Sequence, residues 1–88
     1  MARSSFDASR DYLAANLRRL RAGAGFTQES MAEKTDLDLS YYLRIERCKA
    51  NPSLRVVCTI ADALGVAPAR LLRKTASVKR VPGRPRGR

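Results

Sequence analysis

The chain has 88 residues, with 18 Lys and Arg against 8 Asp and Glu and no His, which gives a formal net charge of +10. This length suits one small domain with a tail and is short for a two-domain enzyme with an active-site cleft. Apolar residues make up 44% of the chain, enough for a packed core, but no run of about 18 apolar residues occurs that would span a membrane. The basic excess predicts an anionic partner, and nucleic acid is favoured over a membrane surface because no helix looks both strongly basic and lipid-facing.

The residues that most often carry out chemistry are scarce in this sequence. The absence of His removes the commonest general base, and the two cysteines, Cys48 and Cys58, do not make a zinc ligand set or a disulfide framework. We therefore expect no enzyme activity, no metal and no cofactor, and a reducing, cytoplasmic setting. Cys58 is expected in the core, and Cys48 is expected as an exposed, inert thiol.

The basic charge is concentrated at the C-terminal end of the chain. Residues 1–72 contain 11 Lys or Arg against all 8 acidic residues, a net charge of +3, whereas residues 73–88 contain 7 basic residues and no acid. This tail has too few apolar residues to offset the entropy of ordering it, so we expect it to be disordered alone. The chain is thus divided into an N-terminal arm at 1–8, a folded domain at 9–72 and a basic tail at 73–88.

Apolar spacing and capping residues predict five helices and no strand in the folded part. Residues 7–20 place their leucines at the i, i+4, i+7 spacing of one helix face, and Gly25 is a candidate left-handed cap after them. The helices that follow are each bounded by a capping or helix-starting residue: 28–34 after Thr27, 39–47 after Asp38, about 54–64 between Ser53 and Gly65, and 69–73 after Pro68.

The second and third predicted helices have the layout of a helix-turn-helix. About four residues join them, and Tyr42 and Ile45 turn one face of the third helix toward the core. In such a unit the first helix lies across the phosphates and the second enters the major groove. The sequence therefore predicts that the face of residues 39–47 turned away from the core meets DNA.

Residues 13–72 resemble the phage repressor and Cro-like helix-turn-helix family, also called the xenobiotic-response-element type, with its lambda-repressor-like fold. The stretches that carry the resemblance are Phe26-Thr27-Gln28 with Met31-Ala32, Arg44-Ile45-Glu46, Asn51-Pro52-Ser53-Leu54 and the ADALGV run at 61–66. The resemblance implies an all-α, bacterial or phage-encoded, nucleoid-associated regulator of transcription that binds a palindromic operator as a homodimer, with a repressor as the first expectation. It also covers antitoxins and controller proteins of restriction–modification systems, so these remain alternatives, as does a protein-interaction module. A toxin or RNA polymerase would then be a protein partner.

The resemblance also implies roles for individual residues. Those expected at DNA are Gln28, Lys49 and Asn51 on phosphates, Leu39, Ser40, Leu43 and Arg44 on base edges, and Tyr41 and Arg47 near the groove wall or backbone. Arg21 and Glu46 would form an ion pair between the first and third helices. Val66, Leu71 and Leu72 are expected at the dimer interface.

This sequence departs from the family pattern at several positions. Asp36 and Cys48 stand where Gly is usual, which at Cys48 predicts either backbone strain of roughly 1 kcal/mol or a rearranged loop. Ala67 replaces the usual Ser or Thr cap at a cost of about 1 kcal/mol. Leu39 and Leu43 are apolar where the family usually has polar side chains. They are open to three interpretations: contacts to thymine methyl groups, a surface for a protein partner, or a rotated helix.

The end of the tail resembles the AT-hook, a Gly-Arg-Pro core flanked by basic residues. Such a segment is thin enough for the narrow minor groove of A·T-rich DNA, whose negative potential attracts arginine. Arg84, Arg86 and Arg88 would enter that groove, or would bind phosphates without sequence preference. A solubility role or a cloning remnant is the remaining alternative.

Overall fold

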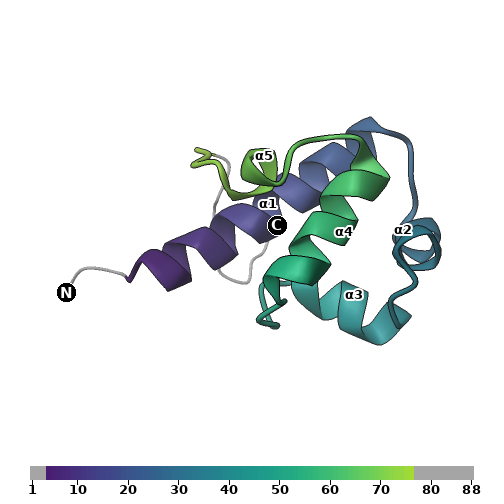
Figure 1. The fold of residues 1–88 in the computed structure, drawn as a ribbon, viewed down its shortest axis with the longest axis horizontal. Coiled ribbons are helices and arrows are strands. Elements are labelled where there is room, and N and C mark those ends of the chain that lie inside the picture. Colours follow the sequence, from purple (N-terminus) through teal and green to yellow (C-terminus); the bar gives the residue numbers. More distant parts are fainter. Residues whose placement is uncertain (1–3, 77–88) are drawn as a thin grey trace, which may run out of the picture.

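The computed structural model describes residues 4–76, which form five α-helices and no strand (Figure 1). The helices are α1 (Ser5–Gly23), α2 (Gln28–Thr35), α3 (Leu39–Glu46), α4 (Leu54–Leu64) and α5 (Pro68–Leu72). The predicted all-α fold class is therefore confirmed. Within the described part, no helix is long and apolar enough to cross a membrane, and no group of three or more metal-binding side chains occurs.

The long helix α1 begins two residues before the predicted start at Asp7. The Ser4 hydroxyl accepts a hydrogen bond from the backbone N–H of Asp7 at 3.0 Å, which satisfies one of the first-turn donors. Residues 5–8, which we expected in an N-terminal arm, are therefore helical.

The caps of the inner helices are those that the sequence indicates. Side-chain oxygens of Thr27, Asp38 and Ser53 accept hydrogen bonds from the N–H three residues on, at 3.0, 3.3 and 3.2 Å. Gly65 ends α4 at φ 71°, where a glycine has no Cβ to clash. Ala67 gives α5 no side-chain cap, as expected, and α5 instead begins with Pro68.

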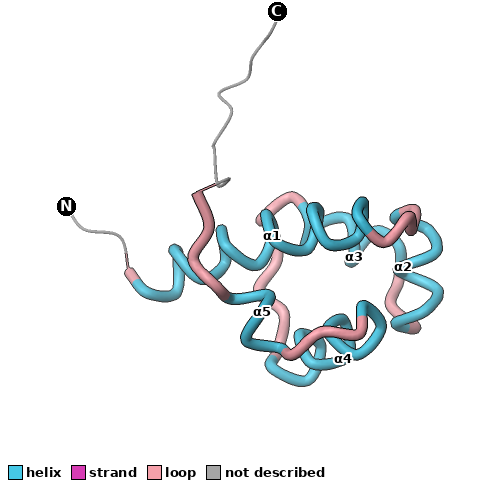
Figure 2. The backbone as a smooth tube through the Cα atoms, turned by 90° about the horizontal axis from the view of Figure 1, so that it is seen from above, coloured by secondary structure: helices cyan, strands magenta, loops and turns pink. Residues whose placement is uncertain are grey.

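The core lies in the middle of the helices and receives side chains from all five of them. Leu17, Met31, Tyr42, Ile60 and Leu71, one from each helix, have no exposed surface. Helix α1 packs on α3 and α5, α4 packs on α2 and α5, and α2 packs on α3, so the helices close into a ring (Figure 2). The ring holds α2 and α3 in a fixed relation at the end of the molecule away from the start of α1 (Figure 1).

Two expectations about apolar side chains are wrong. Leu71 was expected at a dimer interface, but it is fully buried in the core, so a second copy could reach it only if α5 left the domain. Its neighbour Leu72 points outward and is 39% exposed. Cys58 is partly exposed on α4 rather than fully buried.

The chain beyond α5 is bound to α1 by side-chain hydrogen bonds. Asn16, which has no exposed surface, donates from Nδ2 to the carbonyl oxygens of Leu71 at 2.9 Å and Arg73 at 2.8 Å. Arg19 donates to Asn16 Oδ1 at 2.8 Å and to Thr75 Oγ1 at 3.2 Å. Packing therefore continues past Leu72, the expected end of the domain. Arg84, Arg86 and Arg88 lie outside the described residues.

Candidate nucleic-acid interface

Helix α3 presents one face to the core and the other to solvent. Tyr42, Ile45 and Glu46 are buried, at the i, i+3, i+4 spacing of a single helix face. The solvent side carries five of the residues predicted to face DNA: Leu39, Ser40, Arg44 and Arg47, which are exposed, and Leu43, which is half-buried. The structure thus brings these predicted residues together on one surface.

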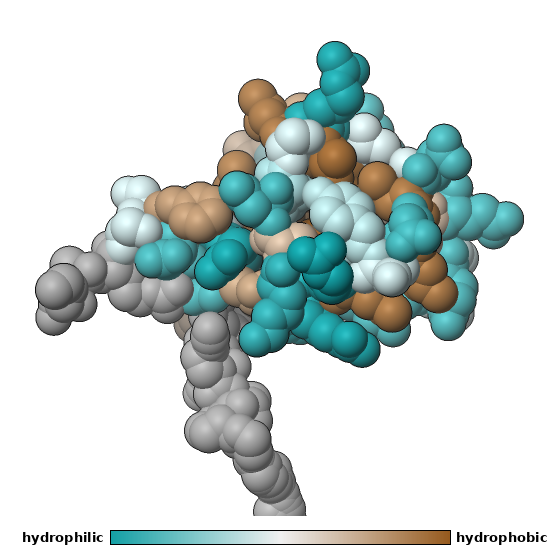
Figure 3. Space-filling view, turned by 90° about the horizontal axis from the view of Figure 1, so that it is seen from below, coloured by the Kyte–Doolittle hydropathy of each residue, from teal (hydrophilic) through white to brown (hydrophobic). Residues whose placement is uncertain are grey.

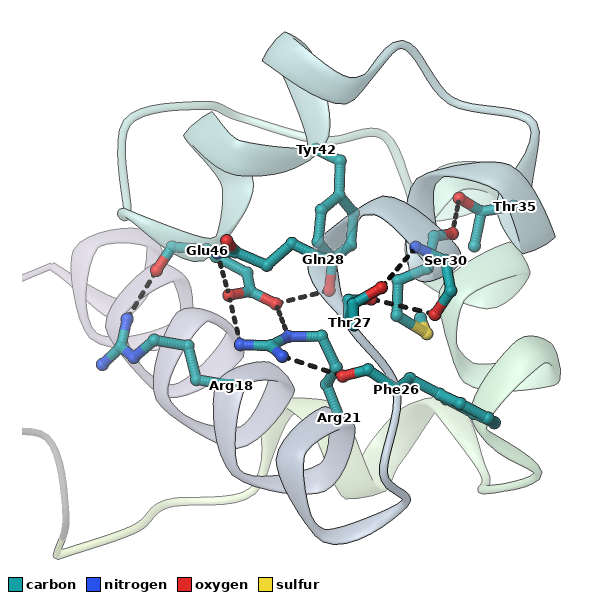
Figure 4. Close-up of polar contacts among 10 residues, drawn as sticks. Arg18, Arg21, Phe26, Thr27, Gln28, Ser30, Thr35, Tyr42 and Glu46 are labelled. Atoms are coloured by element: carbon teal, nitrogen blue, oxygen red, sulfur yellow. Dashed lines mark hydrogen bonds and ion pairs between the residues drawn. The ribbon is translucent and has the colours of Figure 1, made fainter.

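The orientation of α3 is fixed by a buried carboxylate at its last residue (Figure 4). Glu46 is 1% exposed, and its oxygens accept hydrogen bonds from Arg21 Nε at 2.6 Å and Arg21 Nη2 at 3.3 Å. The Tyr42 hydroxyl, one turn earlier on α3, donates to the same carboxylate. Arg21 also donates to the carbonyl of Phe26 at 2.9 Å, at the entry to α2. The expected Arg21–Glu46 ion pair is therefore present, and it ties α1 to both helices of the helix-turn-helix.

This cluster is held in a single ionisation state at neutral pH. Burial alone would raise the pKa of the Glu46 carboxyl, but hydrogen bonds from Arg21, Tyr42 and Gln28 outweigh burial and lower its pKa. The hydrogen bond to Glu46 raises the pKa of Arg21, and burial together with Glu46 raises that of Tyr42. Glu46 is thus an anion and Arg21 its cation, and Tyr42 stays a neutral donor.

Gln28 takes part in this cluster, although we predicted only a phosphate contact for it. Its Nε2 donates to Glu46 Oε1 at 3.0 Å, so one of the two amide hydrogens is used inside the protein. The second hydrogen is left for an outside acceptor. In the first turn of α2 the N–H of Ser30 is bonded to Thr27, while those of Gln28 and Glu29 lack intrahelical acceptors and suit an anion such as a phosphate.

The turn after α3 adopts the strained conformation, one of the two alternatives that the sequence left open at Cys48. Cys48 has a left-handed backbone at φ 61°, and Asp36 in the turn before α3 has φ 56°. The expectation that Cys48 is an exposed thiol is wrong: its side chain is partly buried, and Sγ donates to Oδ1 of the buried Asp11 at 3.0 Å. The turn is thereby bound to α1, with Lys49 and Asn51 exposed beside it.

Arg18 is a further residue that contacts α3 and that we did not predict from the sequence. It lies one turn before Arg21 on α1 and donates from Nη1 to the backbone carbonyl of Glu46, at the end of α3. Its i, i+3 spacing from Arg21 is the signal that could have revealed it. Arg44, on α3 itself, donates to the carbonyl of Lys49 in the following turn at 3.4 Å, a weak contact that leaves its guanidinium at the surface.

The surface around the end of α3 combines basic and apolar side chains. Arg18, Arg44, Arg47 and Lys49 are all exposed there, and cations of this kind suit phosphate oxygens. The view from below, the side on which α3 lies in Figure 1, shows apolar side chains set among hydrophilic ones (Figure 3). An exposed helix with basic side chains at one end and mixed side chains along it can bind a backbone and base edges at once.

Comparison with known proteins finds the same arrangement in helix-turn-helix proteins. A family model described as a helix-turn-helix domain matches residues 12–74. A transcription factor from Neisseria meningitidis, described as hypothetical, is 40% identical over 63 residues, which cover 72% of this chain and 59% of that protein. The immunity repressor protein of Bacillus phage phi105 is 33% identical over 63 residues, which cover 72% of this chain and 44% of that protein.

A solved structure agrees with the fold. The restriction-modification controller protein C.AhdI from Aeromonas hydrophila superposes with a TM-score of 0.69 at 36% identity, over 73% of this chain and 97% of that one. The two curated relatives are longer, since the matched part spans only 59% and 44% of their length. The shared part is therefore the helical domain described above.

Proposed function

The chain belongs to the helix-turn-helix domain family, and we propose that it is a sequence-specific DNA-binding regulator of transcription that acts as a homodimer on a palindromic operator. The observation that carries this proposal is the outward face of α3, held in place by the buried Glu46 cluster. A recognition helix must be fixed relative to the domain before its side chains can select among base edges.

In this proposal, some residues of α3 and the adjacent turns contact the bases, and others contact the DNA backbone. Ser40 and Arg44 hydrogen-bond to base edges in the major groove, with Leu39 and Leu43 beside them. Gln28, Tyr41, Arg47, Lys49 and Asn51 set the position of the domain through the groove wall and the phosphates. Arg84, Arg86 and Arg88 add phosphate or minor-groove contacts from the tail.

A second copy is proposed to dock on an apolar groove beside the start of α4. Phe6, Leu54 and Leu72 are 50%, 72% and 39% exposed, and all three line one groove of about 200 Å³. Arg10 lines this groove, and its Nη2 lies 3.9 Å from Asp7 Oδ1, so opposite charges lie together at this rim. In a two-fold symmetric dimer the same surface of each copy forms the interface, so Asp7 of one copy can face Arg10 of the other.

This interface differs from the one that the sequence suggested. Of the three residues predicted there, only Leu72 lines the groove, while Val66 is half-buried against the core and Leu71 is fully buried within it. Phe6 and Arg10 precede the stretch matched by the family model, so this part of the surface belongs to the chain's own extension of α1.

Sedimentation velocity tests the interface. Leu54→Asp should give monomers at concentrations where the wild type is a dimer, because it places a charge among the apolar side chains that line the groove. Leu39→Asp, on the exposed face of α3, is the matched control and should remain a dimer. A Leu54→Asp protein that sediments as the wild type does would rule out this surface, and a wild type that is monomeric throughout would rule out the homodimer.

Repression is the proposed effect on transcription, supported by the similarity to a phage immunity repressor. A controller of restriction–modification genes is the second candidate, because C.AhdI shares the fold at 36% identity. The antitoxin and protein-interaction alternatives rest on the sequence alone. We place the regulator in the cytoplasm at the nucleoid, with no enzyme activity of its own.

Selection of bound duplexes from a random pool, using the full chain, tests the function. The proposal predicts a shared sequence with inverted half-sites whose centres lie about one helical turn, or roughly 34 Å, apart. A matched variant with Arg84, Arg86 and Arg88 changed to Ser should recover the same half-sites, and any A·T-rich flanks should disappear. If the full chain enriches no sequence over the starting pool, the proposed function is wrong.

A further inference from the structure

The exposed face of α3 carries a pair of aliphatic side chains in line. Leu39 is 37% exposed at the first residue of the helix, and Leu43 follows one turn later, half-buried. The i, i+4 spacing sets them one above the other on the helix surface. Ser40 and Arg44 form the adjacent i, i+4 pair, so an apolar column runs beside a polar one.

The fold does not require an apolar side chain at Leu39. The core face of α3 is occupied by Tyr42 and Ile45, which are 0% and 2% exposed, and the N-terminus of the helix is capped by Asp38. Few large hydrophobic side chains are this exposed in residues 4–76; the others are Phe6, Leu54 and Leu72, which gather on the groove described above. Leu39 stands apart from that groove, on the face proposed to meet DNA.

Chemistry restricts what such side chains can recognise in a major groove. Leucine has no hydrogen-bond donor or acceptor, so it cannot distinguish bases by their polar edges. The one apolar group that a base pair presents in the major groove is the C5-methyl of thymine. We infer that Leu39 and Leu43 of α3 contact thymine methyl groups in the major groove and so recognise thymine, an inference that rests on the proposed function.

The helix geometry sets the spacing of the bases that are read. Residues four apart lie about 6 Å apart along a helix axis, and stacked base pairs lie about 3.4 Å apart. Leu39 and Leu43 therefore meet thymines in base pairs that are one or two steps apart. The half-site holds both thymines, with the hydrogen bonds of Ser40 and Arg44 made to the base pairs beside them.

The charges that follow on α3 favour DNA over a protein at this face. Arg44, five residues after Leu39, and Arg47, directly after the last residue of α3, are both exposed, and Arg18 and Lys49 lie at the end of the helix. A polyanion is attracted by this set of side chains, whereas an apolar protein surface would leave the cations without counter-charges. Binding of a protein partner is therefore an outcome that would contradict the inference.

The test replaces thymine by deoxyuridine, which removes only the methyl group. In the sequence selected by the full chain, each thymine is replaced in turn, and the Kd is measured by fluorescence anisotropy. Loss of a buried methyl should weaken binding about four-fold at two positions of each half-site, and other positions should change by less than about two-fold.

Variants assign each methyl to its side chain. With Leu39→Ala the effect of deoxyuridine should disappear at one of the two positions, and with Leu43→Ala at the other. Ser40→Ala, on the neighbouring column, is the control and should keep both effects. Because the deoxyuridine series in the wild type needs no mutant, the test stands even if Leu43→Ala unfolds.

The outcomes separate the inference from the proposed function. A wild type that prefers its selected sequence but binds the deoxyuridine duplexes unchanged overturns methyl recognition and leaves the function intact. Effects that persist in both leucine variants overturn the assignment to α3. A wild type without any sequence preference overturns the proposed function, and the inference with it.

Discussion

Replacing Glu46 by Gln should cost the domain a large part of its stability. The Glu46 carboxylate is 1% exposed and accepts hydrogen bonds from Arg21, Gln28 and Tyr42. The Gln amide has only one acceptor oxygen, and its NH2 group would face the donors of Arg21, Gln28 or Tyr42. The Arg21 guanidinium then loses its counter-charge and at least one of its hydrogen bonds.

The size of the loss follows from the burial of both partners. Removing one partner of a buried ion pair costs about 3–5 kcal/mol. The Arg21 side chain is 18% exposed, so water can recover part of its hydration, and we expect the lower end, about 3 kcal/mol. In a domain of this size each kcal/mol shifts Tm by about 4–8 °C, so Glu46→Gln should lower Tm by roughly 12–24 °C.

Thermal unfolding followed by far-UV circular dichroism at neutral pH measures this change. Glu33→Gln is the matched control, because Glu33 is an exposed residue of α2 and its substitution should change stability by no more than about 0.5 kcal/mol. If Glu46→Gln and Glu33→Gln unfold at the same temperature, the cluster does not hold α3 as described.

Three further predictions concern stability. Since the native pKa of Glu46 lies below its usual 4.5, the ionised carboxylate stabilises the folded state above about pH 4.5, and this stabilisation is lost as pH falls through the native pKa. The Tm difference between the wild type and Glu46→Gln should therefore shrink in acid. A Tm difference that stays constant with pH would contradict the ionised pair. Ala67→Ser should stabilise the domain by about 1 kcal/mol in urea unfolding, because α5 gains the side-chain cap that it lacks, whereas an unchanged midpoint would show that the α5 terminus needs no cap. Asn16→Ala should destabilise it by about 2–4 kcal/mol, since two carbonyl groups lose their donor, and a loss below about 1 kcal/mol would mean that water replaces the amide.

The local part of the fold could be predicted from the sequence because its signals are local. Thr27, Asp38 and Ser53 each cap a helix within three residues, and Gly65 supplies the positive φ at the end of α4. The early start of α1 has a local signal as well, Ser4 followed three residues later by Asp7, which is typical of a helix N-terminus. The outward face of α3 follows from helical periodicity once Tyr42 and Ile45 are taken as core.

What the sequence could not predict depends on contacts between distant residues. Cys48 and Asp11 are 37 positions apart, and only the packing of the turn against α1 brings thiol and carboxylate together. Leu71 and Leu72 are adjacent in a five-residue helix, which is too short for periodicity to show which of them faces the core. The groove has the same origin, since its lining comes from α1, the loop before α4, α4 itself and α5.

If the outward face of α3 selects a DNA sequence, the ratio of two dissociation constants will show it. The Kd for the selected duplex and that for a scrambled duplex are measured at physiological salt, for the wild type and for Arg44→Lys, which keeps the charge but removes the planar fork that binds a base edge at two points. The wild type should prefer the selected duplex by about 1,000-fold or more. Arg44→Lys should lower this preference by about ten-fold or more, with little change in the Kd for the scrambled duplex. A wild-type ratio near one, or an equal ratio in both proteins, would contradict sequence selection by α3.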